Sequence, residues 1–283
     1  YGDHRDLHVR SRRQRQMCIR DRHVNPDGDA IGSALALKLL LDSMNIDSTV
    51  SFDITGELPS NLNHLPYDLI TTPQVDSFET VFVFDCGNSS RLGDLEELVL
   101  NSSKVVVVDH HIDPTFGDIQ IIDPKAASTT QVLYRIFKEE ELPISKEIAD
   151  CLMTGLITDT GRFQYSNTNA EVFAIASDLM DRGSQLSLIS ENIYGSIELN
   201  ALKLQSEIIN RLILDTDLKF IYSIVYQEDY EKFNTTPAET DSLIDVVRLA
   251  KESEIALLLK EQTDGSFKGC LLYTSPSPRD LST

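Results

Sequence analysis

The sequence predicts an α/β protein, with a doubly wound, mainly parallel sheet followed by a second, smaller and incomplete α/β domain. Two short runs of β-branched or aromatic residues, Val81–Phe84 and Val105–Val108, are typical of buried parallel strands. These runs alternate with longer apolar segments of helical period. Such alternation is typical of a doubly wound sheet, in which functional loops follow the carboxyl ends of the strands.

Helices are expected around these strands. Ala30–Met44 is almost continuously apolar. Ser128 and Gln131 have the spacing of a capping box, in which two side chains satisfy free amides at a helix start. Further helices are predicted over Ile148–Ile157 and over Ala170–Arg182, the latter ended by a glycine.

The pattern changes near residues 190–200, where a second domain is expected to begin. Its predicted elements are a helix over Glu198–Leu214, a strand over Lys219–Tyr226, a helix over Asp241–Ala250, a strand over Ile255–Leu259 and a turn at Thr263–Gly265. This domain stops after one hairpin turn, which predicts an incomplete sheet.

Composition restricts the function classes. The chain has 283 residues, 41% hydrophobic and 25% charged, which is ordinary for a globular protein and excludes disordered, collagen-like and coiled-coil chains. No apolar run is long enough to predict a membrane-spanning helix. The net charge of −20 disfavours long nucleic acid, unless metal ions or a local basic patch hold it. The four cysteines lack CxxC spacing, so a reducing cytoplasm is the expected compartment.

The two ends differ from the body. Residues 1–22 contain seven arginines and three aspartates, a net charge of +4. A nucleic-acid-binding arm and a targeting peptide are alternatives, although no apolar stretch follows. MCIRDR near this end and CLLYTSPSPRDLST over residues 270–283 resemble translated sequencing-adapter read-through. We therefore expect residues 1–22 and 270–283 to be non-native and to pack poorly.

Four acidic clusters stand at the ends of predicted elements. They are the HVNPDGD loop before the first helix, the aspartate after the first strand, the DHH sequence after the second strand and the TDTG sequence after an apolar helix. The side chains that they contribute as candidate ligands are His23, Asp27, Asp29, Asp85, His110 and Asp159. Each cluster alone could be a solvated turn or a helix cap. Together, carboxylates at one crevice would repel each other unless cations lie among them. Imidazole plus carboxylate favours manganese, iron or zinc, and two ions with one bridging carboxylate would accommodate all six ligands.

The sequences HVNPDGDAIGS, VFDCG, VVVVDHHID and TGLITDTGRF resemble, in order, the four motifs of DHH-family phosphoesterases. The resemblance covers residues 23 to about 190, the expected catalytic domain. A weaker stretch over Ala238–Gly269 resembles the start of the DHHA1 substrate-binding domain, which sets a partial second domain at 191–269. The length of the chain and two of its motifs, NPDGD and DTGRF, resemble the NrnA-type branch of the family, whose members are oligoribonucleases and phosphatases of adenosine bisphosphate (pAp).

The resemblance implies roles for the candidate residues. His23, Asp27 and Asp85 would hold one metal ion, and Asp29, Asp85, His110 and Asp159 would hold the other, with manganese the expected metal. Asp109 would orient a histidine, and His111 would contact the scissile phosphate or assist the leaving group. Asn25 and Arg162 are candidate phosphate contacts, although surface roles are equally open for both.

Two departures from the family affect these expectations. The family has a helix and a first strand before the first motif, whereas RRQRQMCIRDR here lacks a strand pattern. The family's glycine-rich substrate motif has no match after Gly269.

The expected function is hydrolysis of short oligoribonucleotides to mononucleotides and removal of the 3′-phosphate of pAp. A manganese inorganic pyrophosphatase, a RecJ-like single-strand exonuclease and a catalytically impaired nucleotide-binding fragment are the alternatives. The expected partners are short RNA and pAp, with neither long duplex nor membrane. Oligomeric state stays open, with a homodimer as one option.

Overall fold

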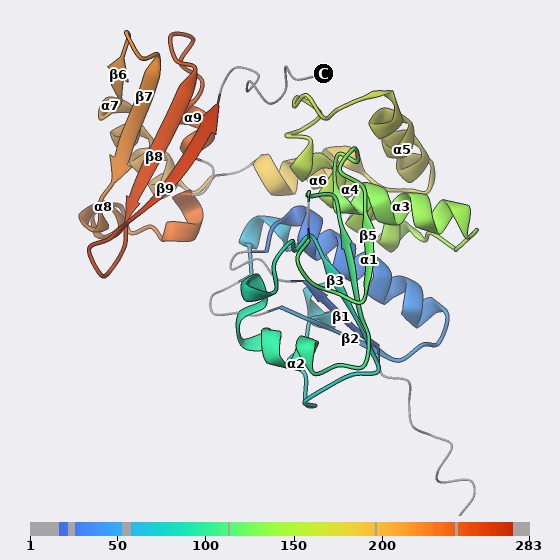
Figure 1. Cartoon of the computed structure of the whole chain (residues 1–283). Coiled ribbons are helices and arrows are strands. Elements are labelled where there is room, and N and C mark those ends of the chain that lie inside the picture. The colour runs from blue at the N-terminus through green and yellow to red at the C-terminus, as the bar shows by residue number, and fades with distance from the viewer. Residues whose placement is uncertain are drawn as a thin grey trace, which may run out of the picture. The chain divides into compact units, whose positions relative to one another are not determined.

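The computed structural model describes residues 17–21, 26–52, 58–112, 114–195, 197–240 and 243–273. The chain divides into two compact units, Tyr1–Gly195 and Ser196–Thr283, each with its own apolar core (Figure 1). The change of pattern predicted near residues 190–200 agrees with this division.

A parallel sheet forms the centre of the first unit. Its five strands have the order β2-β1-β3-β4-β5, and every neighbouring pair is parallel. The strands are β1 (Met17–Asp21), β2 (Ser48–Ser51), β3 (Thr80–Phe84), β4 (Val105–Asp109) and β5 (Ile119–Ile122). β4 is buried along its whole length, as a β-branched run in a parallel sheet requires.

Helices cover both faces of this sheet, so the predicted doubly wound α/β class is confirmed. The larger core packs β3 and β4 side chains against α1, α3 and α4, and a smaller core packs the opposite side chains against α2 and η3. The helices of this unit are α1 (Gly28–Ser43), α2 (Glu96–Leu100), α3 (Thr129–Glu139), α4 (Lys146–Asp159), α5 (Ala170–Asp181) and α6 (Leu186–Tyr194), with 3₁₀ turns η1 (Ser60–Leu62), η2 (Tyr67–Leu69) and η3 (Ser89–Leu95). Within the described residues, no helix has the length and apolar character that a bilayer crossing needs.

The first strand corrects an expectation from the sequence. Met17–Asp21 was expected to lack strand structure, yet it forms β1 between β2 and β3, with Ile19 paired to both Val50 and Phe82. Flanking arginines hide the short Met-Cys-Ile run in the sequence. The other residues of the expected arm, 1–16 and 22, lie outside the described part of the chain.

The second unit holds a four-stranded sheet of order β6-β7-β8-β9, in which only β7 and β8 are parallel. Its elements are α7 (Leu199–Asn210), β6 (Ile213–Asp215), β7 (Phe220–Val225), α8 (Gln227–Phe233), η4 (Pro237–Thr240), α9 (Leu243–Val247), β8 (Ile255–Glu261) and β9 (Phe267–Tyr273). The helix predicted to reach Leu214 therefore ends at Asn210, because the chain reverses there to pair as β6.

The expected C-terminal tail is partly wrong. Cys270 lies opposite Leu258 in β9, and both Cys270 and Leu272 pack against the core of the second unit. The first residues of the 270–283 segment therefore belong to the fold. Residues 274–283 lie outside the described part.

The start of α3 modifies the predicted capping box. The Ser128 hydroxyl accepts a hydrogen bond from the Gln131 amide at 3.0 Å, as expected for an N-cap. The Gln131 side chain, however, accepts from the amide of Ala127 at 2.7 Å, one residue earlier than the capping box requires. This hydrogen bond joins the loop before α3 to the first turn of the helix.

Two glycines bring α1 and α4 close together. A Cβ atom on Gly32 would lie 2.4 Å from the carbonyl oxygen of Cys151, and one on Gly28 would lie 2.6 Å from Cγ2 of Thr158. Neither separation is sterically allowed, so the two helices approach as they do because these positions lack side chains. This approach sets the separation of Asp29, near the start of α1, from Asp159 at the end of α4.

We predict that Gly32→Ala lowers the free energy of unfolding by about 1–3 kcal/mol, because the added methyl group meets backbone that cannot move aside. Alanine is the better helix former, so helix propensity alone predicts the opposite sign. Gly87→Ala is the control, since open space surrounds that position, and its effect should stay within about 0.5 kcal/mol. Urea unfolding measures both; equal stability of the two variants would show that the α1–α4 approach is not fixed by Gly32.

Candidate metal centre

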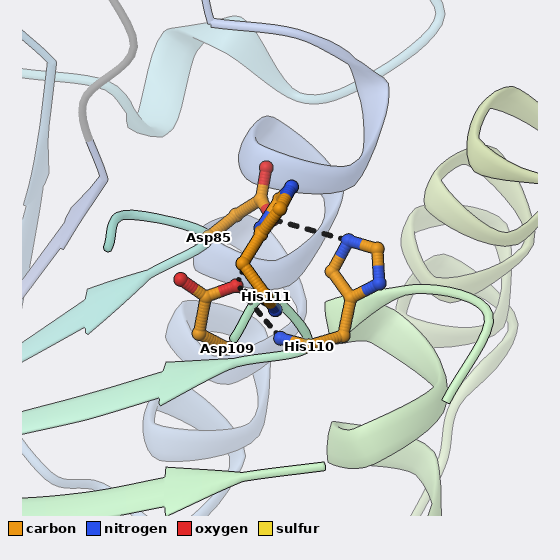
Figure 2. A group of neighbouring side chains, drawn as sticks. All are labelled: Asp85, Asp109, His110 and His111. Atoms are coloured by element: carbon orange, nitrogen blue, oxygen red, sulfur yellow. Dashed lines mark hydrogen bonds and ion pairs between the residues drawn. The ribbon is translucent and has the colours of Figure 1, made fainter. Parts of the chain in front are cut away.

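The candidate site lies where β3 and β4 end and where α1 begins and α4 ends. Parallel neighbouring strands bring their carboxyl ends to one edge, so Asp85 after β3 and Asp109 at the end of β4 lie close together. Figure 2 shows these two aspartates with His110 and His111, which follow β4 directly. Asp29 and Asp159 reach the same edge from α1 and α4.

The His110 ring is oriented toward three carboxylates. Its Nε2 atom lies 3.1 Å from Asp159 Oδ2, 3.5 Å from Asp85 Oδ1 and 4.0 Å from Asp29 Oδ2. Its Nδ1 atom lies 3.4 Å from the carbonyl oxygen of Ala126. A backbone carbonyl on one ring nitrogen leaves the other free as a metal ligand.

Asp29 is anchored by the start of α3. Its two carboxylate oxygens accept hydrogen bonds from the Thr129 amide at 2.6 Å and the Thr130 amide at 2.9 Å. Helix N-termini favour anions, because their first amides lack partners within the helix. Gly155 of α4 makes room for this contact, since a Cβ atom there would lie 2.5 Å from Asp29 Oδ1.

Asp85 adopts a left-handed backbone conformation with φ of 51°, and its side chain is buried. Such strain in a non-glycine residue is characteristic of functional sites. Its Oδ1 atom accepts a hydrogen bond from the Thr129 hydroxyl at 3.2 Å and lies 3.2 Å from His111 Nδ1. One carboxylate oxygen therefore faces both histidines, as Figure 2 shows.

Asp109 holds the DHH turn together. Its Oδ1 atom accepts from the amides of His110 at 2.7 Å and His111 at 2.9 Å, and lies 2.8 Å from His111 Nδ1. Asp109 Oδ1 therefore contacts both the backbone amide and the ring of His111. The His111 side chain is 53% exposed, which leaves the rest of its ring open to solvent.

Burial and mutual repulsion raise the pKa of three carboxylates. Withdrawal from water raises the pKa of Asp29 well above its usual range, with the charges of Asp159 and Asp85 adding to the shift. Burial likewise raises the pKa of Asp159, with Asp27 and Asp85 as the neighbouring charges. Asp27 caps α1 and keeps part of its surface exposed, yet desolvation and the Asp85 charge raise its pKa to about 6. A nearby cation would favour the ionised form of each of these carboxyls and so oppose the rise in its pKa.

Asp85 shifts in the opposite direction. Burial alone would raise its pKa, but the hydrogen bond and charge of His111, together with the charge of His110, outweigh burial and lower it. Correspondingly, hydrogen bonds to Asp109 and Asp85 raise the pKa of His111 to about 10. Of the carboxylates in this cluster with shifted pKa values, Asp85 is therefore the one whose ionised form the surroundings favour.

The donor set fits a divalent metal ion. His110 Nε2 is buried without a hydrogen-bond partner, although three carboxylates surround it. Two groups of ligand atoms each lie within 4.8 Å: Asp85, Asp109, His110 and His111 form one, and Asp29, His110 and Asp159 form the other. Mixed imidazole and carboxylate donors suit manganese, iron or zinc better than calcium.

The chain reverses direction directly after Asp159. Gly161, Arg162 and Phe163 all have positive φ, between 54° and 62°, which makes a short left-handed turn. The Arg162 guanidinium carbon lies 4.4 Å from the ring centre of Tyr194, and the residue is exposed. Its predicted contact with phosphate stays a prediction, since no described contact joins Arg162 to the acidic cluster.

The structure thus brings together Asp29, Asp85, Asp109, His110, His111 and Asp159, and places Asp27 within electrostatic reach of them. His23 and Asn25 lie outside the described residues. Thr129 and Thr130, whose amides bind Asp29, were not among the site residues predicted from the sequence. The Ser-Thr-Thr sequence before an apolar helix was the available signal, but it was interpreted only as a cap.

Comparisons with known proteins agree with this geometry. Residues 21–156 match the N-terminal domain of the DHH family. A probable bifunctional oligoribonuclease and PAP phosphatase, NrnA, of Streptococcus mutans is 29% identical over 248 residues, which are 87% of this chain and 78% of that protein. A probable manganese-dependent inorganic pyrophosphatase of Streptococcus agalactiae is 26% identical over 265 residues, 89% and 80% of the two chains.

A solved structure shares the fold. The crystal structure of an exopolyphosphatase-related protein from Bacteroides fragilis matches with a TM-score of 0.85 and 24% identity, covering 96% of this chain and 83% of that one. Its agreement spans both the parallel sheet and the second, mixed sheet of the present chain. Residues 21–156, which match the DHH family, thus carry the Asp/His cluster at the carboxyl ends of β3 and β4, and this match and the cluster together support a metal-dependent phosphoesterase of that family.

Proposed function

We propose that this phosphoesterase hydrolyses short oligoribonucleotides to mononucleotides and removes the 3′-phosphate of pAp. The Streptococcus mutans relative, whose name is probable bifunctional oligoribonuclease and PAP phosphatase, supports this substrate class. Two overlapping groups of ligand atoms support this chemistry. Both include His110, and Asp85, a member of one group, lies 3.5 Å from His110 Nε2. A pair of neighbouring ions is a recurrent device for in-line displacement at phosphorus.

In this proposal, Asp29, Asp85, His110 and Asp159 hold one ion, and Asp85 also serves a second ion with Asp27 and His23. Bound manganese would lower the pKa of a coordinated water, which could then act as the nucleophile, and would neutralise the charge of the phosphate. Asp109 fixes the His111 ring through Nδ1, so the exposed Nε2 edge stays available to a phosphate oxygen or leaving group. A raised His111 pKa keeps that ring protonated and able to donate.

The chain's acidity favours small substrates. With a net charge of −20, the average field of the chain repels long polyanions, whereas bound metal ions would neutralise the carboxylates of the site. Short RNA and pAp place few phosphates outside the metal centre. Inorganic pyrophosphate is the second candidate substrate, favoured by the similarity to a probable manganese-dependent pyrophosphatase.

We predict that the protein with Mn²⁺ releases mononucleotides from a five-nucleotide RNA and phosphate from pAp at least about tenfold faster than it hydrolyses pyrophosphate. Chromatography of the nucleotides and a phosphate assay measure all three rates under one condition. A faster rate on pyrophosphate would replace the proposed substrate class. Activity on none of them, with Mn²⁺ bound, would favour a nucleotide-binding module.

We predict that Asp85→Asn reduces kcat at least about 100-fold more than Arg162→Ala does. Asp85 belongs to one ligand group and lies 3.5 Å from His110, which both groups share, so its loss should disturb both ions, whereas Arg162 stacks on Tyr194 outside the cluster. Asparagine tolerates the left-handed backbone at position 85, so the fold should persist. Circular dichroism checks folding, and similar losses in both variants would contradict the shared-ligand role.

We predict that Mn²⁺ affinity rises with pH through about 6. The raised pKa of Asp27 means that its carboxyl keeps a proton up to that pH, and the proton competes with the cation. Asp27→Asn should remove this rise in Mn²⁺ affinity near pH 6. Any pH dependence that comes from Asp29 and Asp159 should remain. Titration of metal-free protein with Mn²⁺ between pH 5 and pH 8, which brackets that pKa, gives the profile. Affinity independent of pH would exclude Asp27 as a ligand.

A further inference from the structure

A single amide side chain joins two of the segments that carry the metal centre. The Nδ2 atom of Asn167 donates a hydrogen bond to the carbonyl oxygen of Asp159 at 3.0 Å and another to that of Ala127 at 3.1 Å. Two carbonyl acceptors require a donor, so they also fix which end of the amide faces them. Asn167 lies beyond the left-handed turn, eight residues after Asp159.

The two carbonyl groups belong to functional segments. Asp159 ends α4 and faces His110 with its own carboxylate at 3.1 Å. Ala127 precedes the N-cap of α3, the helix whose first amides hold Asp29. The neighbouring Ala126 carbonyl lies against His110 Nδ1. Asn167 therefore joins the backbone of Asp159 to a segment whose other backbone groups contact His110 and Asp29.

The Asp159 contact completes the end of α4. The carbonyl of Leu156 accepts from the Thr160 amide, that of Ile157 from the Arg162 amide and that of Thr158 from the Gly161 amide. The carbonyl of Asp159 is the remaining orphan of the last turn, and Asn167 supplies its donor. Removing the amide would leave this carbonyl and that of Ala127 without this donor, and the end of α4 would lose this hydrogen-bonded link to the segment before α3.

We propose that Asn167 is a positioning residue of the metal centre, which sets the separation of the Asp159 carboxylate from Asp29 and His110. It touches neither substrate nor metal ion in this role, and acts through the backbone of a ligand. The proposal rests on the metal-dependent part of the proposed function and is independent of which phosphoester is the substrate.

Asn167→Ala should weaken Mn²⁺ binding about tenfold or more, since groups that orient ligands typically contribute this much to metal affinity. Calorimetric titration of metal-free protein measures it without substrate. Activity should fall at low Mn²⁺ and recover in excess Mn²⁺, because the ligands themselves remain. A general structural defect would not be rescued by the metal in this way.

Asn169→Ala is the matched control. Asn169 is the same residue type two positions later, and its side chain accepts hydrogen bonds from the Glu171 and Val172 amides as the N-cap of α5. Loss of that cap should lower the unfolding midpoint by about 2–4 °C. Mn²⁺ affinity should nevertheless stay within about twofold of the original protein.

A second variant separates geometry from charge. Asn167→Asp keeps the shape but replaces the donating amide with a carboxylate, whose charge alone would attract a cation more strongly. Positioning predicts weaker Mn²⁺ binding in this variant as well, and the result stands even if Asn167→Ala proves too unstable to titrate. Tighter binding, or equal loss in Asn169→Ala, would overturn the proposal.

The outcomes for Asn167 and for the substrate are distinguishable. Unchanged Mn²⁺ affinity in both Asn167 variants would overturn the positioning role and leave the proposed function intact. If the Asn167 variants bind Mn²⁺ more weakly as expected, but the original protein hydrolyses neither RNA nor pAp, the proposed substrates are wrong and the positioning role stands. A native chain that binds no Mn²⁺ would overturn both.

Discussion

The carboxylate of Asp29 on the first amides of α3 is the interaction on which the site depends. It fixes α1 to α3 through two backbone hydrogen bonds, while Gly155 lets α4 approach the same carboxylate. The resulting junction of three helices lies next to the ends of β3 and β4. A buried charge held this way needs its partners in place, because the cost of leaving it unpaired is several kcal/mol. The close packing of α1 on α4 is therefore a requirement of the chemistry as well as of the core.

Repulsion among the acidic groups is the second constraint. The protein partly offsets it with a helix N-terminus at Asp29 and with the two histidines beside Asp85. Asp159 has the opposite situation, because a helix C-terminus disfavours an anion. The backbone thus stabilises the negative charge of Asp29 but not that of Asp159. A bound cation would stabilise the charge of Asp159.

The sequence allowed much of this to be predicted. Strands β3 and β4 were visible because their runs consist of β-branched and aromatic residues, and the position of the aspartates after them followed from the rule that parallel strands end at a common edge. Strand β1 was not visible, because three apolar residues flanked by charge carry no period. His23, a predicted metal ligand, and Asn25, a predicted phosphate contact, fall outside the described residues, so their roles remain predictions. The contacts of Thr129 and Asn167 depend on how distant segments meet, which no local pattern encodes.

The central position of β1 has a consequence for how the molecule assembles. This strand is the earliest in the described chain, yet both of its neighbours, β2 and β3, come later, and the ligands extend to the end of α4. Contacts that join the segments of the site, such as that of Asp29 with the Thr129 amide 100 residues later, thus close long loops, which makes folding slow relative to a chain of local contacts. Among the described residues, neither ligand group lies within one short peptide, so tight binding of a cation there requires the sheet and its helices to have formed. An ion present at 100 times its dissociation constant would then add about 2.7 kcal/mol to the free energy of unfolding.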